Sequence, residues 1–200
     1  MAVPAWFARG SATAPPGGEV EDLEFPGAEV LELYEPPVGY DLVPLPEPGH
    51  LRWLVTGLSS SSAFISLAFR IRGRLRGWGM ARVYPGPQGP EVALLELFAP
   101  RPERSLYAWM ASALVASARP YQPVIVRAQA SCPLLAAALR RLRFLLGAPQ
   151  PVHVFGGPGA ARTHVTLNTQ DFPMLPYPDE VAPPVAVPGP DAPPGLAVPR

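Results

Sequence analysis

The hydrophobic and polar positions between residues 63 and 99 alternate with the two-residue period of β-strands. Two alternating stretches, 63–71 and 75–84, flank the tripeptide Arg72-Gly73-Arg74, which is typical of a tight hairpin turn. A second turn at 85–90 leads into a third apolar stretch, Glu91–Ala99. We therefore expect an antiparallel meander of three strands.

After Pro100 the spacing of apolar residues changes to that of a helix with one buried face. The apolar positions are Leu106, Trp109, Met110, Ala113 and Leu114. Ser105 is the expected N-cap of this helix, and Pro120 is expected to end it. The short, β-branched stretch Pro123–Ala128 then predicts a buried strand.

A second helix is expected after this strand, with Ser131 as its cap and Pro133 in its first turn. Its predicted apolar face comprises Leu134, Leu135, Ala138, Leu142 and Leu145. Two last strands, 152–155 and 164–168, are expected to form a closing hairpin. The order of elements predicts an α/β (α+β) fold with a mixed sheet, in which a meander precedes helix, strand, helix and hairpin.

Two strand-to-helix junctions, 99–105 and 128–133, follow the carboxyl ends of their strands. Open α/β sheets bind ligands at this edge, because the helix starts and the strand ends converge there. The pattern therefore predicts where a ligand binds more clearly than which reaction takes place.

The 30 prolines are concentrated at the two ends of the 200-residue chain. Residues 176–200 show no apolar periodicity and are expected to be a disordered, proline-rich tail. We also expect residues 1–25 to be a disordered acidic arm, so that residues 26–175 form the folded domain. The tail is either a solvated segment or a binding site for a proline-recognising partner.

The zero net charge hides a strong asymmetry along the chain. Residues 51–175 carry 14 arginines against four acids, whereas residues 1–50 carry nine acids against Arg9. All 16 basic residues are arginine, a bias that a genome rich in G and C produces without functional cause. The partner of the basic core is then the acidic N-terminal segment in cis, a polyphosphate-bearing cofactor or nucleic acid.

Several function classes have little support in the sequence. The single Cys132 excludes an intramolecular disulfide, and the three histidines, His50, His153 and His164, lack the spacing of a metal site. We find neither a secretory leader nor an apolar run long enough to span a membrane, so we expect a cytoplasmic protein. A homodimer stays open.

The order of elements from about residue 50 to 172 resembles the C-terminal two-thirds of the GNAT-type N-acetyltransferase superfamily. The phrase V-I-V-R-A-Q-A-S-C-P-L-L-A-A-A-L-R-R-L-R-F is similar to the family's fifth strand and the helix that follows. The phrase T-H-V-T-L-N-T-Q-D-F-P resembles the closing strand of some bacterial members. The family's first strand and two helices are barely represented, because residues 1–50 are too rich in proline.

The resemblance implies an acetyl-CoA or other acyl-CoA cofactor between the fourth and fifth strands. In the family a glycine-rich turn brings the pyrophosphate onto the first N–H groups of the following helix. Here that segment reads A-P-R-P-E-R-S-L, without glycine, and its arginines would replace part of the attraction through side-chain contacts. The residues implied in cofactor binding are Leu97, Ala99, Arg101, Arg104 and Ser105.

The resemblance also implies an acid and a base for acyl transfer to an amine. The family's tyrosine acid falls on Leu139, which cannot protonate a thiolate, and its glycine falls on Arg143. Glu96 is the catalytic candidate: strict alternation places it as the only charge on an apolar strand face, where burial would make it a usable base. The competing interpretation pairs Glu96 with an arginine such as Arg82 on the adjacent strand. Nothing in the sequence selects Tyr84 or Tyr107 as the acid.

Other features have simpler explanations. Four arginines cluster at the hairpin tip: Arg70, Arg72, Arg74 and Arg76. They either bind phosphates or are simply exposed at the turn, and no aromatic residues alternate with them for stacking on bases. Cys132 is either a nucleophile or a small core residue. Two functions are therefore weighed: a diverged acyl-CoA-dependent N-acyltransferase with an unknown amine acceptor, or a GNAT-like binding or accessory protein that has lost catalysis. Nucleic-acid binding rests on charge alone.

Overall fold

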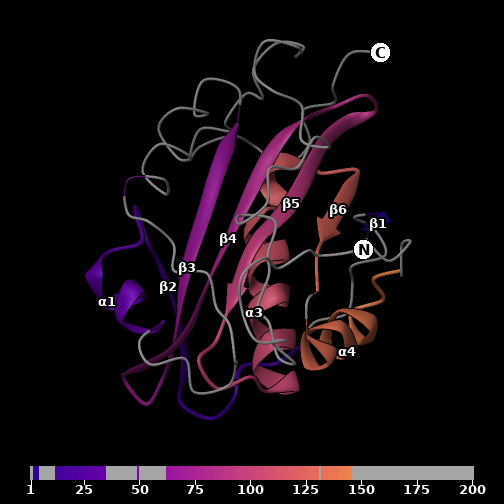
Figure 1. The fold of residues 1–200 in the computed structure, drawn as a ribbon. Helices are drawn as coiled ribbons and strands as arrows, with labels where there is room; N and C mark the ends of the chain where they lie inside the picture. Colours follow the sequence, from indigo (N-terminus) through magenta and orange to yellow (C-terminus); the bar gives the residue numbers. More distant parts are fainter. Residues whose placement is uncertain (1, 5–11, 35–48, 50–61, 131, 146–200) are drawn as a thin grey trace, which may run out of the picture.

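The computed structural model describes residues 2–4, 12–34, 49, 62–130 and 132–145 (Figure 1). They form a six-stranded sheet in the order β1-β6-β5-β4-β3-β2. The strands are β1 (Ala2–Pro4), β2 (Gly18–Asp22), β3 (Ala63–Ile71), β4 (Arg74–Gly86), β5 (Gly89–Phe98) and β6 (Ile125–Ala128). The helices are α1 (Ala28–Glu32), α3 (Arg104–Ser117), the 3-10 turn η1 (Arg119–Tyr121) and α4 (Pro133–Arg141).

The predicted meander of β3, β4 and β5 is confirmed, and it forms the centre of the sheet. The β3–β4 turn is tight because Arg72 and Gly73 both adopt positive φ, 52° and 73°, as a two-residue hairpin loop requires. On β4, Gly79 lets α3 approach closely: a Cβ there would lie 2.8 Å from Leu114 Cδ1. The mixed sheet is completed by β6, which runs parallel to β5.

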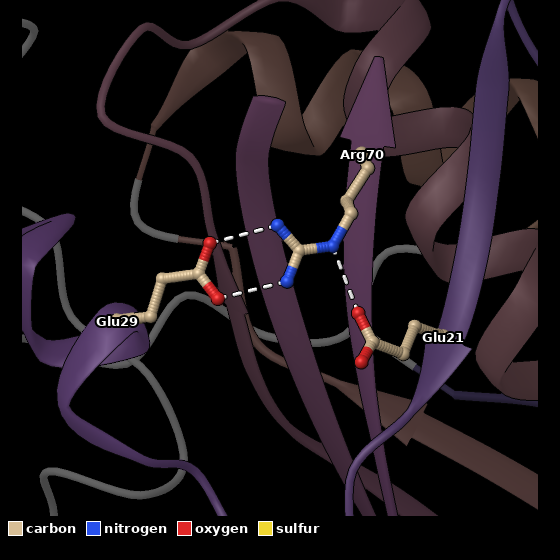
Figure 2. A network of polar contacts seen from close by, with 3 residues as sticks. All are labelled: Glu21, Glu29 and Arg70. Atoms are coloured by element: carbon tan, nitrogen blue, oxygen red, sulfur yellow. Dashed lines mark hydrogen bonds and ion pairs between the residues drawn. The ribbon is translucent and has the colours of Figure 1, made fainter. Parts of the chain in front are cut away.

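The first 25 residues, expected to be a disordered arm, contribute two edge strands instead. β1 pairs with β6 at one edge, and β2 pairs with β3 at the other. Arg70 fixes this second edge: Nε donates to Glu21 Oε2 at 2.8 Å, and both terminal nitrogens donate to the Glu29 carboxylate (Figure 2). The acidic N-terminal segment thus pairs in cis with one arginine of the basic hairpin, which composition alone left among three alternatives.

The two faces of the sheet carry different cores. α3 and α4 cover one face, here called the helix face, with apolar side chains from β3 to β6. α1 and the aromatic residues Tyr34, Trp78, Tyr84 and Phe98 belong to the second cluster, on the opposite face. On that face Tyr34 and Phe98 stack with ring centroids 3.9 Å apart, and Tyr34 Oη accepts from Trp78 Nε1 at 2.8 Å.

Both helices are where the sequence predicts them, but both expected caps are wrong. α3 starts two residues earlier than expected, with Glu103 at the N-cap, so Ser105 lies in the first turn. α4 is capped by Cys132, whose Sγ accepts from the Leu135 N–H at 3.4 Å, rather than by Ser131. Glu103 and Cys132 hold the extended backbone that an N-cap needs, and this conformation outweighs the usual preference for serine.

The predicted apolar face of α4 is correct only in part. Leu135, Ala138 and Leu142 are buried, but Leu134 and Leu145 are exposed. Leu139 takes their place in the core, because the short helix turns that side toward α3. After α4, Phe144 N–H donates to Leu139 O and Arg143 N–H to Arg140 O, with Arg143 at φ 68°. This is a Schellman C-cap, a position that usually favours glycine.

Several predictions fall outside the described residues. They concern the final hairpin at 152–155 and 164–168, the tail 176–200 and the three histidines. Trp78, on β4, is fully buried.

Candidate functional site

The parallel pair β5–β6 ends before β5 does. Its register runs from Glu91↔Ile125 to Leu94↔Ala128, and β5 continues to Phe98. Among the described residues, 96–98 are therefore paired with β4 on one side and with no strand on the other. The sheet opens here, at the carboxyl edge that the two strand-to-helix junctions predict.

A β-bulge lies directly at this opening. Met80 pairs with Glu96 and Ala81 with Leu94, so Leu95 is the extra residue in β5. Glu96 is 2% exposed, and its Oε1 accepts from the N–H of Leu97 at 3.0 Å. A buried carboxylate thus stands at the point where β5 loses its second neighbour.

The bulge corrects the predicted surroundings of Glu96. Strict alternation would place it with Val92, Leu94 and Phe98, but Val92 and Leu94 pack on the helix face. Glu96 shares the opposite face with its pairing partner Met80 and with Phe98. It is not the only charge there, because the pairing also places Arg82 and Glu91 on that face. One inserted residue reverses the face of the residues that follow it.

Arg82, offered above as a partner for Glu96, makes its hydrogen bond to another residue. The register pairs Arg82 with Ala93, and its Nε donates to the hydroxyl of Ser62 at 2.8 Å. The bulge places Glu96 opposite Met80, on the same face of the sheet as Arg82.

The N-terminus of α3 lies at the same edge as the opening. Glu103 makes no side-chain cap hydrogen bond, and the first intrahelical bond described runs from Tyr107 N–H to Glu103 O. The N–H groups of residues 104–106 therefore have no partner within the helix, and the dipole makes this end positive. Pro100 and Pro102 lie before the helix, so they remove none of these donors.

The side chains proposed for cofactor binding divide into two groups. Leu97 and Ala99 are buried in the helix-face core, so only their backbone groups are available to a ligand. Arg101, Arg104 and Ser105 are exposed around the start of α3. The carboxylate of Glu103 lies among them and is balanced by Arg76, whose Nη2 is 3.5 Å from Glu103 Oε1.

An acyl-CoA fits these residues in two respects. The uncapped first turn of α3, with Arg101 and Arg104 beside it, has the donors and the charge that a pyrophosphate binds. Near the opening, Gln129 follows the last residue of β6, and its buried Oε1 finds no hydrogen-bond partner among the residues that the structure describes. Such an acceptor, at the end of the parallel pair β5–β6, is suited to accept a hydrogen bond from an amide N–H of a bound ligand.

Neither tyrosine considered as an acid lies close to Glu96 in the pairing. Tyr107 is buried in the helix-face core. Tyr84 Oη donates to Glu91 Oε2 at 3.1 Å, and burial with the neighbouring Glu91 carboxylate raises the pKa of Tyr84 to about 12. Glu91 and Glu96 are separated by about 13 Å along the strand, because their partners Tyr84 and Met80 are four residues apart on β4. The structure therefore brings the predicted base to the opening without Tyr84 paired beside it.

A second polar cluster, missed from the sequence, lies toward the other end of β5. Arg127 Nε donates to Glu91 Oε2 at 2.9 Å, the same oxygen that accepts from Tyr84. The Glu91 carboxylate raises the pKa of Arg127. Gly86 gives the carboxylate room, since a Cβ there would lie 2.5 Å from Glu91 Cγ. The cluster could have been predicted only from the cross-strand pairing of Tyr84 with Glu91, and this pairing follows only when the register of β4 and β5 is known.

Cys132, the N-cap of α4, packs against both core clusters. Within the described ranges, no group of three or more His, Cys, Asp or Glu side chains is arranged to hold a metal ion. In the same part of the chain, no helix is long and apolar enough to cross a membrane.

No protein-family model and no curated protein matches the chain. Three solved structures are similar. One is a GCN5-related N-acetyltransferase from Anabaena variabilis, with 12% identity and a TM-score of 0.45; the match covers 62% of this chain and 31% of that one. Two are an aminoglycoside acetyltransferase, meta-AAC0020, from an uncultured soil metagenomic sample, in complex with sisomicin and with trehalose. They show 14% identity and TM-scores of 0.48 and 0.46, over 72% of this chain and 97% of theirs.

The chain therefore spans about a third of the length of the Anabaena protein. Identities of 12–14% with TM-scores below 0.5 carry no information on activity. The mixed sheet, with its meander followed by helix, strand and helix, is established by the strand pairing of this chain itself.

Proposed function

We propose that this chain is a diverged GNAT-type N-acyltransferase, which transfers an acyl group from acyl-CoA to an amine. The observation that carries the proposal is the placement of buried Glu96 at the bulge where β5 loses its β6 partner. The uncapped start of α3 lies at the same edge of the sheet. A base, an opening and an anion-binding helix start are thus combined at one edge.

When bound, acyl-CoA supplies an activated thioester. Glu96 acts on the amine directly or through a water molecule, and takes its proton as the nitrogen forms a bond to the acyl carbon. The carbon–sulfur bond breaks, and the thiol leaves with a proton taken from solvent. The N–H groups of residues 104–106, together with Arg101 and Arg104, hold the pyrophosphate.

A second function is favoured by one observation. Leu139, at the position of the family's tyrosine, is fully buried in the helix-face core, so the usual acid is lost. The chain would then be a binding or accessory protein that retains the scaffold without turnover.

Isothermal titration with acetyl-CoA, at low and moderate salt, tests cofactor binding. We expect micromolar affinity, weakened at least about 10-fold by the double substitution Arg101→Ala and Arg104→Ala, because these side chains contact the pyrophosphate. The matched control is Arg140→Ala with Arg141→Ala, which removes two exposed arginines from the end of α4. No detectable binding at millimolar acetyl-CoA would contradict the transferase function.

A further inference from the structure

Arg82 is a buried cation with an unusual set of contacts. It lies on β4, is 4% exposed and faces the side of the sheet opposite α3 and α4. Its Nε donates to Ser62 Oγ at 2.8 Å, and its guanidinium carbon lies 5.4 Å from the centroid of the Tyr84 ring. Burial lowers the pKa of Arg82, because removing the charged guanidinium from water costs free energy.

Other arginines contact carboxylates although they are more exposed. Arg70 binds Glu21 and Glu29, and Arg127 binds Glu91. In the part of the chain that the structure describes, the hydrogen bond of Arg82 is made to a neutral hydroxyl. No bond from its Nη1 or Nη2 group, which together carry four of the five guanidinium donors, is made to the described residues. A buried guanidinium in this state is suited to an anion that arrives from outside the chain.

A polar side chain without a hydrogen-bond partner among the described residues lies next to Arg82. Ser66 is 8% exposed, and its buried Oγ finds no hydrogen-bond partner among the described residues. The register pairs Ser66 with Met80 and Arg82 with Phe64, so the two are diagonal neighbours on one face. Ser66 thus adds a hydroxyl donor on the side of Arg82 that faces Glu96.

The candidate base lies in the same row as Ser66. Met80 pairs with Ser66 on one side and with Glu96 on the other. Rows of side chains on one face are about 7 Å apart along the strands. A small molecule with an anionic and an amino end can therefore reach from the row of Arg82 to the row of Glu96.

We propose that Arg82, with the hydroxyls of Ser62 and Ser66, binds the carboxylate of the acceptor substrate, which is a small amino acid. A carboxylate accepts two parallel N–H bonds from a guanidinium, a geometry that the Nη1 and Nη2 groups provide. The amino group then points toward the row of Glu96. The role of the amine rests on the proposed transferase function, whereas the carboxylate site stands on its own contacts.

The test is carried out on the full chain without acetyl-CoA, at constant ionic strength. Glycine, β-alanine and γ-aminobutyrate are titrated and compared with ethylamine and with inorganic phosphate. We expect at least one amino acid to bind and to raise Tm, while ethylamine does not. Arg82→Gln should weaken binding at least about 30-fold, because it removes one partner of a buried charge pair. Arg74→Gln, an exposed arginine of the same strand, is the matched control.

Equal effects of amino acids and ethylamine on the wild-type Tm would overturn the proposal, even if Arg82→Gln failed to fold. Tighter binding of phosphate than of any amino acid would also overturn it, in favour of a phosphate-bearing ligand. Amino acid binding that depends on Arg82, with no acetyl-CoA binding in the separate titration, would support the carboxylate site and reject the transferase function. The two failures are therefore distinguishable.

Discussion

The two faces of the central sheet are built from the same strands but bury different chemistry. The helix face is apolar from Leu67 and Phe69 on β3 to Val126 on β6. The opposite face holds Trp78, Met80 and Tyr84 together with charged groups. The buried polar or charged residues among those described are Ser62, Ser66, Arg82, Glu91 and Glu96. Strand pairing or, for Ser62, a hydrogen bond to Arg82 places all of them on this opposite face.

This difference separates stability from chemistry. Packing α3 and α4 onto the sheet removes apolar area from water at no electrostatic cost. The opposite face keeps groups that are expensive to bury, and such groups concentrate where a protein binds or reacts. Substitutions on the helix face should therefore change the free energy of unfolding, whereas those on the opposite face should change ligand binding and pH dependence.

The largest effect is expected on the helix face. Leu114→Ala should lower the free energy of unfolding by about 2–5 kcal/mol, because the fully buried side chain leaves a cavity between α3 and β4. Urea unfolding measures this loss. Leu134→Ala, on the exposed side of α4, is the control and should cost less than about 0.5 kcal/mol. Equal losses would mean that the helices are not packed as described.

Tyr84→Phe should lower the free energy of unfolding by about 1–2 kcal/mol at neutral pH, because it removes the hydrogen bond to buried Glu91. The contribution also depends on pH. The pKa of Tyr84 is raised to about 12 in the folded chain from about 10 when unfolded, so its stabilisation is complete below pH 10 and is lost as pH rises to 12. Unfolding of both proteins at pH 8 and 11 measures this. If the difference in unfolding free energy between wild type and Tyr84→Phe is as large at pH 11 as at pH 8, the described cluster is contradicted.

Arg143→Gly should raise the free energy of unfolding by about 0.5–1 kcal/mol. Arg143 holds φ 68° at the C-cap of α4, a conformation that glycine adopts without steric cost. Arg141→Gly, inside the helix two residues earlier, should instead cost about 1 kcal/mol. Thermal or urea unfolding of the pair measures the opposite signs, and a loss for both would show that the C-cap is wrong.

The smallest expected change is for Arg82→Met, which should leave the free energy of unfolding unchanged or raise it by up to about 1 kcal/mol. Methionine keeps the apolar stem and removes a charge that burial disfavours. A loss of about 3–5 kcal/mol, as for one half of a buried ion pair, would contradict the account of Arg82 as a cation kept for a ligand.

The sequence predicts those parts of the fold that rest on local periodicity. Alternation located β3, β4 and β5, and the helical spacing of Leu106, Met110 and Leu114 located α3. The bulge at Leu95 was not predictable, because L-L-E-L is compatible with a regular strand. The face of Glu96 and its relation to Arg82 depend on that single inserted residue.

Contacts between residues far apart in the chain could not be predicted from the sequence, because they also depend on strand order and register. Arg82 and Ser62 are 20 residues apart, and Arg127 and Glu91 are 36 apart, so only strand order and register bring them together. The edge strand β2 was missed because its residues G-E-V-E-D are mostly charged. It is held by pairing with β3 and by the Arg70 contacts rather than by apolar burial.

The most direct test of the account is thiol release from acetyl-CoA in the presence of a panel of primary amines with and without carboxylates. Wild-type protein is compared with Glu96→Gln and with Glu91→Gln, the other buried carboxylate of the same strand. We expect Glu96→Gln to lower the rate about 10²–10⁴-fold with acetyl-CoA binding unchanged, because it removes the base. Glu91→Gln should stay within a few-fold of wild type. An unchanged rate in Glu96→Gln would contradict the role of Glu96 at the opening of the sheet.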